Sequence, residues 1–137
     1  MSDLTDVKVF ELSEKGDERG KLVVIEGGEK KNIPFIIKRV FYIYDTDSNS
    51  IRGKHANLNS SFCLINLQGR CKVRAVDTSG KEKEFTLNKP NIGIFMPPMI
   101  WKDMYDFSHD AILLVLSDEY YDSTEYIHNY ADFLNGV

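Results

Sequence analysis

Apolar and polar residues alternate along much of this chain, as in strands that have one face in a core and the other in water. The clearest case is a segment in which Cys71, Val73 and Ala75 are apolar while Lys72 and Arg74 are charged. Short runs of this kind, separated by turn residues, favour a sandwich or barrel over alternating strands and helices. The predicted strands are Val7–Leu12, Lys21–Glu26, Lys38–Tyr44, Ser61–Leu67, Cys71–Val76, Lys81–Leu87, Ile92–Met96 and Ala111–Leu116.

Two glycines predict how the central strands connect. Gly69 stands between Ser61–Leu67 and Cys71–Val76, and Gly80 stands between Cys71–Val76 and Lys81–Leu87. Glycine adopts the positive φ that a tight hairpin turn requires. We therefore expect three antiparallel strands in succession.

The end of the chain has a helical period instead. Apolar residues recur there at steps of three and four, at Tyr126, Ile127, Tyr130, Phe133 and Leu134. Asp122 and Glu125 have the spacing of a capping box, and Gly136 stands where such a helix would end. This pattern predicts one amphipathic helix packed on an all-β structure, with His128 solvated on its polar face.

The composition narrows the class of protein. The chain has 137 residues, with 17 Lys and Arg against 21 Asp and Glu, for a net charge of -4. We expect one domain over residues 1–137, and the acidic balance argues against nucleic-acid binding. The longest strongly apolar run, Ala111–Leu116, is far shorter than the roughly 20 residues that cross a bilayer. Since no secretory signal is visible either, we expect a cytoplasmic protein without a membrane partner.

The two cysteines, Cys63 and Cys71, fall in predicted strands. Their separation of eight positions fits no known redox or zinc-binding spacing. We therefore interpret both as small apolar core residues.

One of the three histidines stands among other chemically useful residues. His55 follows Arg52-Gly53-Lys54 and precedes Ala56-Asn57, whereas His109 fits a turn before a strand. An imidazole with an ordinary pKa of about 6.5 can take a proton from a carbon beside a carbonyl, and an arginine can hold a phosphate or an oxyanion. The same residues also suit an exposed loop whose charges have no role, and they leave both interpretations open.

The sequence resembles a known family at these residues. The hexapeptide Arg52-Gly53-Lys54-His55-Ala56-Asn57, together with segments from Asp17-Glu18-Arg19-Gly20 to Tyr120-Tyr121-Asp122, is similar to the cupin family of nucleotide-sugar 3,4-ketoisomerases. That family's pattern reads Arg-Gly-x-His-Ala-His. The resemblance covers nearly the whole chain, in family order.

The resemblance implies a small cupin jelly-roll barrel with one C-terminal amphipathic helix. It also implies a TDP-4-keto-6-deoxy-D-glucose 3,4-ketoisomerase, which moves the ketone from C4 to C3 without a cofactor, for 3-amino-3,6-dideoxy sugars of lipopolysaccharide or S-layer glycans. By position, His55 would be the base, and Tyr42, a further catalytic candidate, would line the sugar pocket with Arg52. Arg19 or Lys38 would meet the diphosphate. Such cupins are commonly homodimers.

Two residues depart from the family pattern. Asn57 replaces the second histidine of the motif, and Lys102 follows the tryptophan where relatives often have histidine. We keep Asn57 as a catalytic candidate, because its amide still donates a hydrogen bond, and Lys102 as a substrate-binding candidate. Trp101 either packs in the core or an interface, or lines the mouth of the barrel and binds substrate. Because His55 has no further histidine or carboxylate nearby in the sequence, we expect no metal site.

Two other functions stay open at this point. A related cupin 3,5-epimerase would remove protons at C3 and C5 without moving the ketone, although the C-terminal signature argues against it. A non-catalytic cupin that binds a sugar nucleotide is suggested by Asn57 and Lys102.

Overall fold

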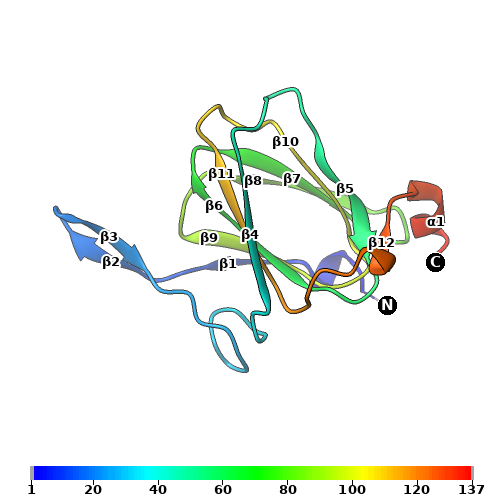
Figure 1. Ribbon diagram of the computed structural model, residues 1–137, viewed down its shortest axis with the longest axis horizontal. Helices are drawn as coiled ribbons and strands as arrows, with labels where there is room; N and C mark the ends of the chain where they lie inside the picture. The colour runs from blue at the N-terminus through cyan, green and yellow to red at the C-terminus, as the bar shows by residue number, and fades with distance from the viewer. Residues whose placement is uncertain (1, 137) are drawn as a thin grey trace.

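The computed structural model describes residues 2–136 and consists mainly of two five-stranded antiparallel sheets that face each other (Figure 1). The first sheet has the order β1-β9-β6-β11-β4. Its strands are β1 (Lys8–Glu11), β9 (Ile92–Met96), β6 (Phe62–Gln68), β11 (Ile112–Ser117) and β4 (Arg39–Tyr44).

The second sheet has the order β12-β5-β10-β7-β8. Its strands are β12 (Tyr126–Ile127), β5 (Arg52–Asn57), β10 (Trp101–Tyr105), β7 (Cys71–Val76) and β8 (Glu82–Leu87). The turns at Gly69 and Gly80 have φ of 70° and 87°, the positive values that the sequence predicts, but the expected run of three antiparallel partners is wrong for β6 and β7. The turn at Gly69 joins β6 of one sheet to β7 of the other, so only β7 and β8 pair directly.

A separate hairpin extends away from the two sheets. It is formed by β2 (Glu14–Asp17) and β3 (Gly20–Val23), and Figure 1 shows it projecting from the end of the molecule opposite to β5 and β12. Of the predicted strand Lys21–Glu26, only the first half is a strand.

The core lies between the two sheets, and strand alternation decides which residues enter it. In β7, Cys71, Val73 and Ala75 are fully buried while the charged residues between them are only half-buried, as the alternating pattern predicts. Leu64 and Ile94 of the first sheet are buried in the same cluster. The expected all-β cupin-like architecture with one C-terminal helix is confirmed.

The C-terminal helix is much shorter than its apolar stripe predicts. Helix α1 spans only Tyr130–Leu134, and its cap is Asn129, whose side chain accepts from the Asp132 amide. Tyr126 and Ile127 form β12 because they pair with the free edge of β5. Asp122 caps a short 3-10 helix, η2 (Ser123–Glu125), so the predicted capping box does not start the α-helix. Within residues 2–136, no helix has the length and apolar character needed to cross a bilayer.

Cys63 and Cys71 are both free and fully buried. Burial raises the pKa of each thiol to about 12, so neither forms a reactive thiolate at neutral pH. Their interpretation as core residues is confirmed.

Candidate active site

A cavity of about 270 Å³ opens between the two sheets, where β5, β10 and β12 lie opposite β4, β6 and β11. The first sheet supplies an apolar wall that comprises Phe41, Ile43, Phe62, Leu64 and Val115. The second sheet and the segment after it supply a polar wall that comprises Arg52, His55, Lys102, Tyr126 and His128. An apolar cavity with a few converging polar groups is the usual form of a small-molecule site.

His55 projects from β5 into this cavity, and its tautomer is set by the backbone. Its Nδ1 lies 3.0 Å from the carbonyl oxygen of Gly53. A carbonyl only accepts, so Nδ1 carries the hydrogen and Nε2 keeps its lone pair. Burial and the Lys102 ammonium lower the pKa of His55 to about 4, against the opposing effect of the Gly53 carbonyl. At neutral pH the ring is therefore uncharged and able to accept a proton at Nε2.

Lys102 faces His55 from the neighbouring strand, where the two residues are register partners. Its side chain is buried, and its Nζ lies 3.4 Å from Oδ1 of Asn57 and 4.6 Å from the ring centroid of Phe62. Burial lowers the pKa of Lys102 to about 7, although the Glu125 carboxylate opposes this shift. The cavity thus contains a neutral base and a partly protonated amine side by side.

Glu125 lies behind Lys102 and ties the loop after β5 to the C-terminal segment. Its carboxylate accepts from the backbone amides of Asn59 and Ser60 at 2.8 and 2.9 Å, and from the Ser60 hydroxyl. Burial alone would raise the pKa of Glu125, but these hydrogen bonds outweigh it and lower the pKa. Glu125 is therefore an anion at neutral pH close to the Lys102 ammonium.

Asn57 occupies the space between these two charged groups. Its Oδ1 accepts from Lys102, whereas its buried amide nitrogen has no partner in hydrogen-bond geometry. Asn57 is not among the residues that line the cavity. The structure therefore places it behind the cavity wall, as a residue that orients Lys102, rather than at the reacting atoms where we expected it.

A shallow groove adjoins the cavity and shares Phe41 and Tyr126 with it. Its other lining residues are Arg39 and Tyr121. The Arg39 guanidinium donates to the Tyr126 hydroxyl at 3.2 Å and lies 5.7 Å from the Tyr121 ring centroid, while its Nε is buried without a partner. Sequence reasoning did not select Arg39.

Strand alternation also corrects two predicted site residues, Tyr42 on β4 and Lys38 directly before it. Arg39, Phe41 and Ile43 point inward, whereas Tyr42 and Lys38 point to the opposite side. Tyr42 is exposed and packs against the ring of Tyr44, and Lys38 lies near Glu119 and over the ring of Tyr120. Neither reaches the cavity of its own chain.

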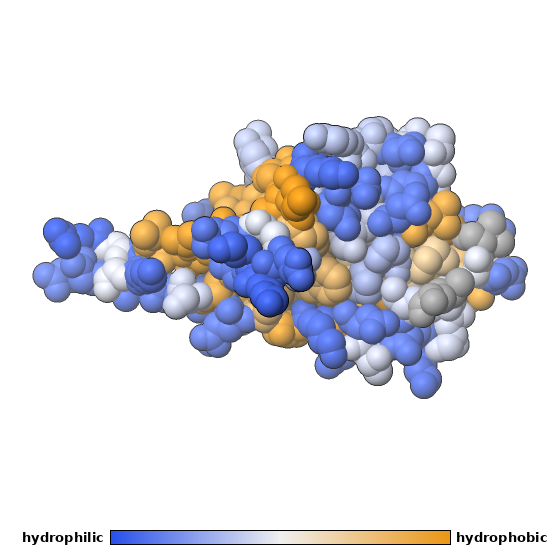
Figure 2. All heavy atoms as spheres, turned by 90° about the horizontal axis from the view of Figure 1, so that it is seen from below, coloured by the Kyte–Doolittle hydropathy of each residue, from blue (hydrophilic) through white to orange (hydrophobic). Residues whose placement is uncertain are grey.

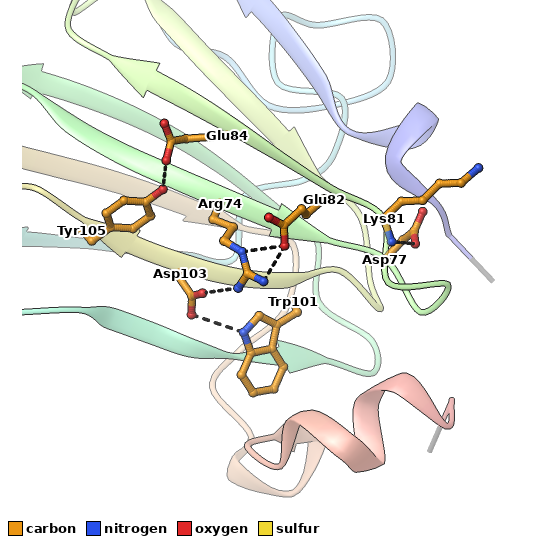
Figure 3. Close-up of polar contacts among 8 residues, drawn as sticks. All are labelled: Arg74, Asp77, Lys81, Glu82, Glu84, Trp101, Asp103 and Tyr105. Carbon is orange, nitrogen blue, oxygen red and sulfur yellow. Dashed lines mark hydrogen bonds and ion pairs between the residues drawn. The ribbon is translucent and has the colours of Figure 1, made fainter.

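Trp101 does not line the cavity either, because β10 turns it to the outer face of the second sheet. Its ring packs against Tyr130 and Phe133, and its indole nitrogen donates to Asp103 at 3.2 Å (Figure 3). Asp103 also accepts from Arg74 on the neighbouring strand. Trp101 thus packs beneath α1, in the alternative role that the sequence left open, and its neighbour Lys102 points inward.

Arg52 lines the cavity as predicted, but Arg19 does not. Arg19 lies at the turn of the β2–β3 hairpin, where its side chain is 87 % exposed and its guanidinium pairs with Asp17 at 2.8 Å. That hairpin projects from the opposite end of the molecule (Figure 1).

His128 lines the rim of the cavity, and its side chain is exposed as the sequence predicts, but it does not lie on a helix. It follows β12, and its ring stacks on Tyr126 and lies 5.9 Å from the ring of His55. The helical interpretation of this segment hid its role. His109 lies in a turn directly before β11, as expected.

Among residues 2–136, no three His, Cys, Asp or Glu side chains come together in a group that could hold a metal ion.

Comparison with known families assigns this fold to a family. The model of the family described as "FdtA: WxcM-like, C-terminal" matches residues 5–137. This chain belongs to that family. The chain is also similar to the TDP-4-oxo-6-deoxy-alpha-D-glucose-3,4-oxoisomerase of Aneurinibacillus thermoaerophilus. The two sequences are 44 % identical over 126 residues, which cover 92 % of this chain and 88 % of the relative.

Solved structures show the same likeness in three dimensions. The sugar 3,4-ketoisomerase QdtA of Thermoanaerobacterium thermosaccharolyticum, in complex with TDP, has a TM-score of 0.92 and 39 % identity, covering 97 % of this chain and 95 % of that one. The TDP-fucose-3,4-ketoisomerase WlaRA of Campylobacter jejuni has a TM-score of 0.88 and 42 % identity, covering 95 % and 94 %. A histidine-to-asparagine variant of QdtA is solved in complex with TDP-4-keto-6-deoxyglucose.

Proposed function

We propose that this chain is a TDP-4-keto-6-deoxy-D-glucose 3,4-ketoisomerase. The observation that carries the proposal is the neutral His55, with Nδ1 bound to the Gly53 carbonyl and Nε2 free in a cavity that also holds a buried lysine. A family match over residues 5–137 and a 44 % identical 3,4-oxoisomerase support it.

The reaction needs a base and a place for negative charge. The C4 carbonyl acidifies the proton on C3, and His55 takes this proton at Nε2 to give an enediolate. The imidazolium then returns the proton to C4, while the O3 hydroxyl proton passes to O4 and the ketone forms at C3. Positioned acid–base groups of this kind are worth about 10²- to 10⁴-fold in rate.

The cavity and the adjoining groove suit the two halves of the substrate. A volume of about 270 Å³ fits the sugar, so the nucleotide extends outward. We place the diphosphate near Arg52 at the cavity and Arg39 in the groove, because guanidinium groups bind phosphate oxygens through paired donors. The rings of Tyr121 and Tyr126 then offer faces for the thymine base.

The experiment that tests this function is incubation with TDP-4-keto-6-deoxyglucose in heavy water, followed by NMR. We expect a 3-keto product with deuterium at C4, because the proton on His55 exchanges with solvent before its return. A 3,5-epimerase would retain the 4-ketone and place deuterium at C3 and C5. A non-catalytic binding protein would leave the sugar unlabelled, and either result would contradict the proposal.

We also propose that two copies of the chain form a homodimer. The strand β4 lies at an edge of the first sheet, and its outward side chains Val40, Tyr42 and Tyr44 are 56 to 64 % exposed. Figure 2 shows apolar side chains gathered next to the projecting hairpin. Leu22 of that hairpin and Ile36 are also exposed. An exposed apolar area of this kind on an edge strand favours pairing with a second copy. Because the substrate is a nucleotide sugar, we place the protein in the cytoplasm.

A further inference from the structure

Lys102 is buried in a way that lysine rarely is. Lys102 is 4 % exposed, and among residues 2–136 no other lysine or arginine is buried. Lysine is almost never fully buried unless it is paired, since removal of its charge from water is costly. Yet Lys102 forms no ion pair within the described residues; its direct contacts are the neutral Asn57 and Phe62.

The carboxylate that would neutralise Lys102 is already engaged. Glu125 directs its oxygens at the Asn59 and Ser60 amides and at the Ser60 hydroxyl. Glu125 thus favours the charged form of Lys102 from a distance but leaves its ammonium hydrogens free. Asn57 accepts one of them, so two remain to point into the cavity.

The geometry assigns Lys102 a direct role in the chemistry. We propose that its ammonium donates to O4 of the sugar and holds the negative charge that develops there while His55 removes the proton from C3. This inference rests on the proposed isomerase function. As the C3–H bond breaks, its electron pair forms the C3–C4 double bond and the carbonyl π pair moves to O4. Lys102 stays protonated throughout, and the proton of O3 later passes to O4.

This role explains why the two buried groups stand opposite each other. Burial is the main reason that His55 stays in its neutral, basic form, and the Lys102 ammonium adds to it because each cation disfavours a second one nearby. Pairs of titratable groups whose pKa values are driven apart in one site mark the acid and the base. A charged donor in a water-poor cavity is also worth far more to an oxyanion than the same donor in water.

The role predicts a dependence on pH, because a neutral amine cannot hold the charge on O4. The groups that surround Lys102 are His55 and Asn57 on β5, Arg39 on β4, and Glu125 before β12. Burial lowers the pKa of Lys102 most, Glu125 raises it and Arg39 lowers it slightly further, with a result of about 7. Turnover should therefore fall as pH rises above this value.

Two substitutions separate this role from a structural one. Lys102→Arg keeps a cation that stays charged at high pH, and Lys102→Met keeps the shape without the charge. Lys83→Met on the exposed strand β8 is the matched control. The measurements are kcat and kcat/KM for TDP-4-keto-6-deoxyglucose from about pH 5 to about pH 9, TDP affinity by calorimetry, and thermal stability.

We expect wild type and Lys83→Met to lose about tenfold in kcat per pH unit above the pKa of Lys102. Lys102→Arg should remain active without this alkaline decline, and Lys102→Met should lose about 10²- to 10³-fold in kcat. Lys102→Met should still bind TDP and be at least as stable as wild type, because a buried charge is replaced by an apolar chain of similar length.

The inference is overturned if Lys102→Met keeps more than about a tenth of the wild-type kcat, or if Lys102→Arg declines at high pH as wild type does. Should Lys102→Met fail to fold, the pH profile of Lys102→Arg decides alone. A wild-type protein that makes no 3-keto sugar contradicts the proposed function, and this inference falls with it.

Discussion

His55 depends on two neighbours for its chemistry. The Gly53 carbonyl fixes the hydrogen on Nδ1, and Lys102 opposes protonation of the ring. An isolated imidazole would be partly protonated near pH 6.5 and would populate both tautomers. In this cavity the ring is held neutral with its lone pair directed inward, which is what a base for a carbon acid requires.

His55→Asn should abolish isomerisation. Asparagine has a similar size but cannot accept a proton at working pH, so we expect a loss of about 10²- to 10⁴-fold in kcat. TDP affinity and thermal stability should change little, because the proposed place of the nucleotide is outside the sugar cavity. Kinetics and calorimetry on the purified variant test this, and a variant with more than about a tenth of the wild-type rate would show that another residue is the base.

Glu125 provides a test of the network behind the cavity. Its folded-state pKa is lowered, so its contribution to the free energy of unfolding is complete above its unfolded value near 4.5 and is lost as pH falls through the folded value. Glu125→Gln should cost about 1 to 3 kcal/mol at neutral pH. Chemical denaturation at a series of pH values should show this difference shrinking below about pH 4.5; a difference that stays constant there would mean that the carboxylate charge is not what stabilises the loop.

The element that places His55 is an irregular strand. In β5, Gly53 and Lys54 have φ of 84° and 56°, and the pairing of β10 with β5 shifts in register between Lys102 and Asp103. A Cβ added at Gly53 would lie 2.7 Å from the Lys102 carbonyl oxygen. Glycine at this position therefore lets β5 and β10, the strands that carry His55 and Lys102, approach closely.

Gly53→Ala should damage both stability and turnover. The positive φ and the contact with the rigid Lys102 backbone together should cost about 1 to 3 kcal/mol, and displacement of His55 should lower kcat by about tenfold or more. Gly80→Ala is the matched control, because Gly80 has a φ of 87° but open space around the added Cβ. Equal effects of the two substitutions on kcat would contradict the role of the close approach.

The same irregularity limits what the sequence predicts. Alternation identifies the regular strands such as β7, and the resemblance identifies His55 and Arg52, both of which line the cavity. Alternation does not identify β5 and β10 as strands, because their inward positions include the polar residues Arg52, His55 and Lys102 rather than apolar core residues. Side chains on adjacent positions of a strand face opposite ways, so a prediction that is correct to within one residue selects Lys38 and Tyr42 instead of Arg39 and Phe41.

The C-terminal segment shows a second limit. Tyr126 and Ile127 satisfy a helical period, but the open edge of β5 gives them backbone partners that a sequence window cannot reveal. Pairing with that edge, rather than helix formation, is what brings Tyr126 and His128 to the cavity.

At the scale of the whole molecule, the shape separates Arg19 from the cavity of its own chain. Its hairpin projects away from its own cavity, so a role for Arg19 at the diphosphate requires the cavity of a second copy. The exposed apolar side chains near the hairpin provide a surface on which that copy would pack. The proposed homodimer would then have two sites, each with His55 from one chain and Arg19 from the other.

Mixing two variants, one with weakened TDP binding and one without the base, tests this arrangement. Arg19→Ala alone should weaken TDP binding by about 10- to 100-fold, the value of a charge-assisted hydrogen bond to a phosphate, and His55→Asn alone should be inactive. If the chains are unfolded together and refolded as a mixture, about half of the dimers are mixed, and each mixed dimer contains one site with both residues intact. At low substrate concentration the mixture should therefore recover about a quarter of the wild-type activity. Activity no higher than the average of the two separate variants would show that Arg19 does not complete the site of a partner chain.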